Sequence, residues 1–173
     1  MKINVRLNSK DISTAISQVE RTKVELMAKL EQFVSELADV GIEVIKDNVK
    51  IEVDGEVRNF GDSVVFRKEI SETSDGATCL LIVSGNEFLK EWTAGSAMVN
   101  PLLMAEFGSG RYAGEHRGSF PNQTHAINPP WFWVDMNGKK HKSYGNEPSR
   151  PLYKATVEME EQIHEVAERV FST

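Results

Sequence analysis

The chain has one cysteine, so it can form no disulfide of its own and no zinc site built from cysteines. Cys79 lies in an apolar run that continues to Val83, which predicts a small buried side chain rather than a reactive thiol. The apolar runs fall well short of the ~18–20 residues that a membrane-crossing helix needs. The first six residues lack the apolar core of a secretory signal, and we therefore expect a protein made and kept in a cytoplasm.

Positive charge is also scarce. Lys and Arg number 20 against 26 Asp and Glu, which gives a net charge of −6 and an isoelectric point near 5.3. This balance argues against tight, sequence-independent binding of duplex DNA over the whole surface. With 173 residues, 40% apolar and 27% charged, the chain has the size and composition of one folded domain, residues 1–173.

Proline is absent from residues 9–100, which permits a long helix near the N-terminus. Asp11 or Ser13 can cap its start. An apolar stripe at spacings of three, four or seven residues, interrupted at Lys23, predicts the helix itself. Gly41 can end this helix, but the pattern continues in phase, and we favour an end near Asn48. The stripe comprises Ile12, Ile16, Val19, Leu26, Leu30, Phe33, Leu37, Val44 and Ile45.

Several segments alternate apolar and polar residues, which predicts strands. These are residues 1–8, a hairpin at 49–57 turning at Asp54-Gly55, and an antiparallel pair within 61–84 turning at 74–76. Residues 77–83 are apolar on both faces, so we expect a central strand there.

The second half of the chain begins with an ambiguous stretch, 86–108, in which 101–107 fits either a short helix or a strand. Residues 108–130 contain many glycines and prolines, which predicts a long loop. A hairpin at 131–144 follows, and an apolar stripe from Pro151 onward predicts a C-terminal helix. The expected fold is therefore α+β, an antiparallel sheet packed against two helices with a loop-and-hairpin insertion.

The residues that commonly carry chemistry form no recognisable pattern. The four histidines lack metal-ligand spacing, and no phosphate loop or nucleophile elbow is present, so we assign no catalytic residue, cofactor or metal. A small hydrolase-like enzyme using Glu106, His125 and Asp135 in the 106–141 region stays open as an alternative.

Charge is unevenly distributed along the chain. Residues 11–40 carry six acids against three bases and residues 150–172 carry five against three, whereas residues 107–147 carry five bases against three acids. Acidic helices joined to a basic loop suit head-to-tail contacts between copies, and a solvated loop with scattered bases is the plainer alternative. The aromatic run Trp131, Phe132 and Trp133 is typical of an interface anchor or of a cap on the domain's own core. The five bases are Arg111, Arg117, Lys139, Lys140 and Lys142.

Four motifs together resemble a known family. Asn100-Pro-Leu-Leu-Met-Ala-Glu-Phe-Gly-Ser-Gly110 is similar to the "apolar–Glu–Phe–Gly–Thr/Ser–Gly" motif of the neck proteins of long-tailed bacteriophages and prophages, called tail-completion, head–tail joining or minor tail components. Three further motifs look like the Gram-positive phage branch of that family. These are Phe120–Ala126 with Trp131–Trp133, His141–Gly145, and Pro148–Ala155.

The resemblance implies a structural protein with no catalytic residues. Members of the family form a ring, usually a hexamer, that contacts the head-completion or adaptor proteins and the tail terminator or tail tube. Duplex DNA would pass through the ring without specific binding, and the protein would be found at the virion neck and, during assembly, in the cytoplasm of the bacterial host. A module that binds a host protein is a third alternative.

The family motif maps onto four residues here, Glu106, Phe107, Gly108 and Pro151, with Ala155 completing the start of the last helix. We expect Gly108 and Gly110 to permit tight backbone turns, Phe107 to anchor in the core and Glu106 to pair with a base. The loop at 108–130 is longer than in compact members, so the contacts of that loop are not transferred.

Overall fold

The computed structural model describes residues 9–53, 55–85, 88–92, 95–109, 112, 131–134, 140–143 and 145–172. The expected strand at 1–8 and nearly all of the expected loop at 108–130 lie outside these residues. The described part confirms the α+β class, with a long N-terminal helix, a C-terminal helix and antiparallel strands. No described helix is long and apolar enough to cross a membrane.

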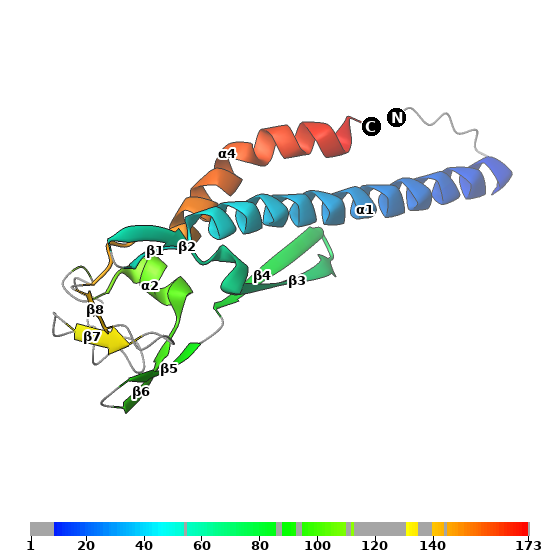
Figure 1. The fold of residues 1–173 in the computed structure, drawn as a ribbon. Coiled ribbons are helices and arrows are strands. Elements are labelled where there is room, and N and C mark those ends of the chain that lie inside the picture. The colour runs from blue at the N-terminus through cyan, green and yellow to red at the C-terminus, as the bar shows by residue number, and fades with distance from the viewer. Residues whose placement is uncertain are drawn as a thin grey trace.

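The longest element is α1 (Ser9–Asn48), a helix of 40 residues that forms the long axis of the molecule in Figure 1. It continues past Gly41 to Asn48, as favoured from the sequence. The reason is packing: Gly41 is buried, and a Cβ built on it would lie 2.9 Å from Sδ of Met159 in α4 (Pro151–Phe171). This glycine allows two helices to approach closely and does not end one.

Helix α4 lies antiparallel along the C-terminal half of α1. Near the start of α4, Nζ of Lys154 donates to Oδ1 of Asn48 at 2.9 Å. At its other end, the ring centroids of Phe171 and Phe33 lie 6.0 Å apart, and Nε of Arg169 donates to a carboxylate oxygen of Glu36 at 2.9 Å. Val166 and Val170 of the expected stripe are buried in α4, and Ala155 is buried beside them, whereas Ile163 of that stripe is 41% exposed.

Among the described residues, the strands form four separate antiparallel hairpins. The pairs β1 (Lys50–Val53) with β2 (Glu56–Asn59) and β3 (Val64–Thr73) with β4 (Gly76–Gly85) match the predicted hairpins, as do β7 (Trp131–Val134) and β8 (Lys140–Ser143). The pair β5 (Phe88–Trp92) and β6 (Gly95–Val99) falls in the stretch that the sequence left ambiguous. A short 3₁₀ turn, η1 (Gly61–Ser63), precedes β3.

The expectation of a central strand at 77–83 is wrong for the described residues, because β4 pairs there with β3 alone. One face of this hairpin lies on α1, where Nζ of Lys68 donates to Oγ of Ser35 at 2.8 Å and contacts Asp39 at 2.9 Å. The other face carries Leu80, which is 58% exposed. Cys79 is half-buried, and this burial raises the pKa of its thiol.

The core lies where the C-terminal end of α1 meets β3, α4 and α2 (Pro101–Phe107). Of the helix and the strand that the sequence allowed at 101–107, the structure has the helix. Asn100 caps α2 by accepting from the backbone N–H of Leu103 at 3.2 Å. Figure 1 shows α2 and the hairpins β1–β2, β5–β6 and β7–β8 gathered at this end of α1, away from its N-terminal end. The buried cluster comprises Ile45, Val49, Val64, Leu102, Ala105 and Ala155.

Candidate functional site

The last turn of α2 holds the start of α4. Oε2 of Glu106 accepts a hydrogen bond from the backbone N–H of Leu152 at 2.7 Å. Leu152 follows Pro151, which has no N–H, so it offers the first free donor of the helix. The residue at the N-cap position, Arg150, makes no side-chain capping bond. Glu106 therefore serves as the cap of α4 from another element, and its negative charge is favourable at a helix N-terminus.

The segment before α4 is bound to two other elements. The backbone N–H of Arg150 donates to the carbonyl of Ala105 at 3.0 Å, and Arg150 adopts a left-handed conformation with φ of 53°. The hydroxyl of Ser149 donates to the carbonyl of Asn48 at 2.6 Å. Because carbonyls at helix C-termini lack partners within the helix, these bonds tie the ends of α1 and α2 to the beginning of α4.

Two buried polar residues complete this arrangement. Ser109 is fully buried and Asn146 is 4% exposed. The backbone N–H of Ser109 donates to the carbonyl of Asn146 at 2.9 Å, and the N–H of Asn146 donates back to Oγ of Ser109 at 3.0 Å. Oδ1 of Asn146 accepts from the backbone N–H of Glu52 in β1 at 2.8 Å. This reciprocal pairing fixes residues 108–109 against residues 145–146 and β1.

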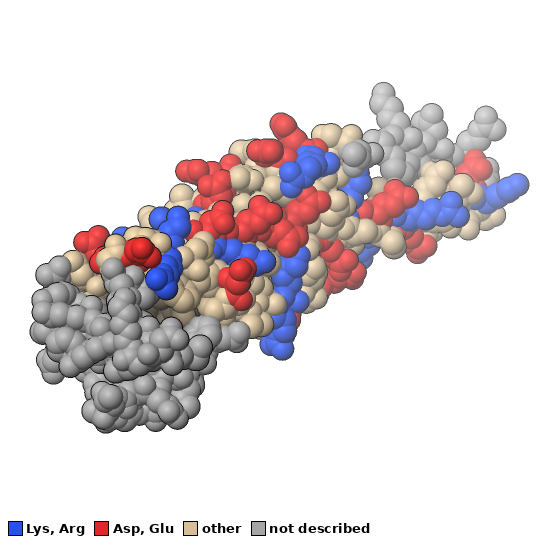
Figure 2. Space-filling view, viewed as in Figure 1, with Lys and Arg blue, Asp and Glu red and all other residues tan. Residues whose placement is uncertain are grey.

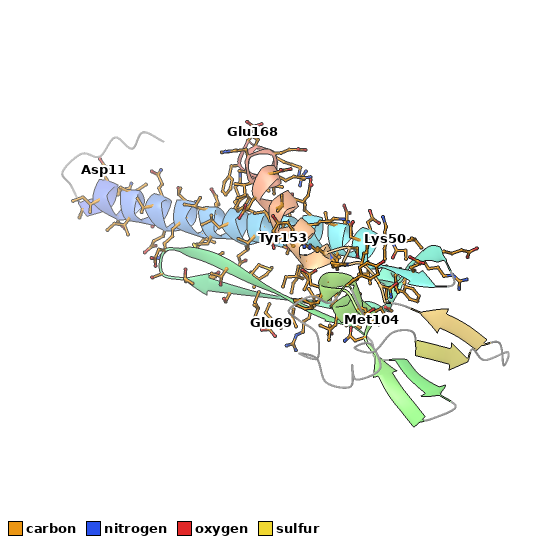
Figure 3. All side chains as sticks on the ribbon, turned by 90° about the vertical axis from the view of Figure 1, so that its left-hand side faces the viewer. Asp11, Lys50, Glu69, Met104, Tyr153 and Glu168 are labelled. Atoms are coloured by element: carbon orange, nitrogen blue, oxygen red, sulfur yellow. The ribbon has the colours of Figure 1, made fainter. Side chains whose placement is uncertain are left out.

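Gly108 lies at the centre of this pairing and has a conformation that favours glycine, with φ of 74° and ψ of 179°. A Cβ at this position would lie 3.0 Å from the carbonyl oxygens of Asn146 and Tyr112. The sequence expectation that Gly108 permits a tight backbone turn is therefore confirmed. We call the whole arrangement, residues 48–52, 105–109 and 145–152, the motif junction. In Figure 3, Lys50 in β1 lies within it, and Met104 on α2 and Tyr153 in α4 are the residues next to it in the chain.

The structure describes some of the other candidate interface residues and leaves the rest outside the described part of the chain. Phe107 is half-buried within the motif junction, and Pro151 is buried at the first position of α4. Backbone register pairs Phe132 with Lys142 and Val134 with Lys140, with Trp131 and Trp133 in the same β7 strand. The remaining candidates lie outside the described residues: Gly110, Arg111, Arg117 and Lys139.

Of the residues of the open enzyme alternative, Glu106 alone lies in the part of the chain that the structure describes. The Glu106 carboxylate caps α4, while His125 and Asp135 lie outside the described residues. His164 is exposed, and the described residues hold no cluster of His, Cys, Asp and Glu that fits a metal ion. The pairing of Glu106 with a base stays a prediction. The structure shows a different contact, in which the Glu106 carboxylate accepts from the backbone N–H of Leu152 at the N-terminus of α4.

Acidic side chains gather over α4 and the adjoining part of α1 on the face shown in Figure 2. Glu36 of α1 contacts Arg169 of α4, and hydrogen bonds from Gln32 and Arg169 lower the pKa of its carboxyl group. Among the described residues these charges belong to the two helices that the sequence identified as acidic. The face has the sign of charge that repels phosphates.

The motif junction was only partly predictable. The sequence pointed to Glu106, Gly108 and Pro151, but it gave no signal for Asn146 beyond a polar residue following a glycine. No family model, curated protein or solved structure matches the chain. Function is therefore inferred from the contacts and from the motifs themselves. The polar side chains of the motif junction form hydrogen bonds with backbone groups of its other segments, and these bonds hold α1, α2, β1 and α4 together.

Replacing Glu106 by alanine is expected to lower the free energy of unfolding by about 1–2 kcal/mol, because α4 loses the acceptor for its first N–H. Chemical denaturation followed by circular dichroism measures this change. Glu161→Ala, an exposed glutamate within α4, is the matched control and should change stability by less than about 0.5 kcal/mol. Equal losses in the two variants would contradict the capping role.

Proposed function

We propose that this chain is a structural subunit of the head–tail junction of a long-tailed bacteriophage or prophage. It acts by protein–protein contacts, assembling into a ring, hexameric as in the family it resembles. The ring joins a head-completion or adaptor protein to the tail terminator or tail tube, and it performs no catalysis.

One observation carries the proposal. The motifs at 100–110 and 148–155, which carry the resemblance, are separated by about 40 residues of sequence yet meet in the motif junction. Glu106 and Gly108 from the first motif contact residues of the second or of its preceding turn. Because the two motifs bond to each other, they support a fold shared with that family. Their residues hold helices and strands together, which supports a structural role over a catalytic one.

Charge gives secondary support. The acidic face over α1 and α4 suits a ring through which duplex DNA passes without being held. The basic segment, residues 107–147, begins at the motif junction and returns to it. We propose that this segment supplies much of the contact between neighbouring subunits or with other neck proteins, by attraction to acidic surfaces.

The proposal is tested by deleting the gene from the phage or prophage that encodes it. Electron microscopy of the lysate should then show DNA-filled heads and separate tails in place of complete virions. Complementation should succeed with the wild-type chain and fail with the double variant Lys140→Glu/Lys142→Glu. The matched control Arg58→Glu/Arg67→Glu, which reverses two exposed bases on β2 and β3, should restore joining. Complete virions from the deletion strain would overturn the proposal.

Hydrogen exchange locates the contact. Amides within 107–147 should exchange at least about tenfold more slowly in assembled necks than in the free chain, because assembly excludes water from them. Unchanged protection across this segment would place the ring contact elsewhere and contradict its assignment.

A further inference from the structure

The N-terminal part of α1 projects beyond the other helices and strands that the structure describes. The N-terminal part of α1 extends past the C-terminal end of α4 in Figure 1, and Asp11 labels the same end of α1 in Figure 3. This part carries four large apolar side chains on one stripe that are about half exposed: Ile12 43%, Ile16 54%, Val19 55% and Leu26 49%. An open apolar hollow lined by Ile12, Ile16 and Val19 lies on it. We call these four residues the exposed stripe.

The exposed stripe continues an interface that is already formed. From Ile12 to Val44 the stripe positions alternate spacings of four and three residues, with Lys23 at one of them. A spacing of 3.5 residues is the repeat by which two helices pair along their length. Further along α1, Phe33 of the same stripe packs against Phe171 of α4. The apolar stripe that contacts α4 at Phe33 therefore continues with the same period into the N-terminal part of α1, beyond the end of α4 at Phe171.

We propose that the exposed stripe is a pairing site for a second copy of this chain, with the two α1 helices antiparallel. Lys23 decides the direction. In a parallel, in-register pair the two Lys23 side chains would meet at the seam, and like charges there repel. In an antiparallel pair Lys23 instead lies opposite Val19 of the second copy, next to Glu20, whose charge is complementary.

The length of the projecting part fixes the register. Placing the two-fold axis between Val19 and Lys23 pairs Ile12 with Leu30 and Ile16 with Leu26 of the second copy, six layers in all when both halves are counted. A register one repeat longer would bring Ile12 against Leu37, in the region where α4 and Lys68 already lie on α1. A shorter register would leave part of the exposed stripe in water.

This inference goes beyond the proposed function and does not rest on it. The exposed stripe lies at the end of α1 remote from the β7–β8 hairpin (Figure 1). A failure of pairing leaves the neck proposal untouched, and a failure of the gene-deletion experiment leaves pairing untouched.

Sedimentation equilibrium of the full chain, at about 10–500 μM, tests the pairing. Val19→Glu should raise the dimer dissociation constant at least about tenfold, because it places a charge in the seam. Val24→Glu is the matched control: Val24 is 69% exposed but off the stripe, and its replacement should change the constant by less than about twofold. Lys23→Leu should lower the constant at least about tenfold. A monomer at all concentrations in both the wild type and Lys23→Leu, or equal effects of the two glutamates, would overturn the proposal.

Disulfide cross-linking tests the register. In a Cys79→Ser background, chains with Ile16→Cys and chains with Leu26→Cys should cross-link when mixed and oxidised, because these positions face each other. Each variant alone should stay uncross-linked. Cross-linking of either variant with itself, with none gained by mixing, would overturn the antiparallel arrangement.

Discussion

Replacing Gly108 by alanine is expected to lower the free energy of unfolding by about 2–4 kcal/mol, one of the two largest effects expected here. Two costs combine. The backbone at φ of 74° and ψ of 179° lies in a region that glycine alone adopts readily. The new Cβ would also lie 3.0 Å from the carbonyl oxygens of Asn146 and Tyr112. Urea denaturation of the purified variant measures the loss.

Gly55→Ala separates these two costs. Gly55 also has a positive φ, 82°, but a Cβ there would meet nothing within 4 Å. We expect a loss of about 1 kcal/mol from backbone strain alone. A Gly108→Ala variant no less stable than Gly55→Ala would show that the carbonyls around Gly108 move aside freely, and the motif junction would then not be the rigid element that the proposed function requires.

Replacing Asn146 by alanine is expected to cost about 2–3 kcal/mol of unfolding free energy. The side chain is 4% exposed, and its Oδ1 accepts from the backbone N–H of Glu52. Alanine removes the acceptor and leaves that N–H without its partner at a site that water enters poorly. Thermal and chemical unfolding report the total loss, and exchange of the Glu52 amide should rise at least about tenfold.

The matched control is Asn59→Ala. Oδ1 of Asn59 also accepts from a backbone N–H, that of Gly61 at 2.6 Å, but Asn59 is exposed and water can replace it. Its replacement should cost less than about 1 kcal/mol. If Asn59→Ala destabilised the protein as much as Asn146→Ala, burial at the motif junction would not be the source of the effect.

The helices were the most predictable part of the fold. The stripe from Ile12 to Ile45 has a single period, so it specifies one face of α1 whatever that face contacts. The role of Gly41 was less certain from sequence, because a glycine that ends a helix and one that admits a neighbouring helix have the same local signal. Only the position of Met159 distinguishes them.

The hairpins were predictable where a turn signal stood between alternating strands, as at Gly55 and at Ser74–Gly76. The β5–β6 hairpin lacked such a clear alternation and was missed. The strand at 77–83 looked central because it is apolar on both faces, but in the described fold β4 has one partner, and Leu80 on its outer face is 58% exposed. The composition of a strand indicates which of its faces are apolar, but it does not specify which strand or helix packs against each face.

The sequence by itself determined the α+β class, the positions of three hairpins and the helical stripe, because each depends on periodicity and turn residues close together in the chain. It also pointed to Glu106 and Gly108 as special positions. Tertiary structure alone decided what they do: Glu106 caps a helix that begins at Pro151, and Gly108 packs against Asn146. Those contacts join residues about 40 positions apart, and no local pattern specifies a partner at that distance.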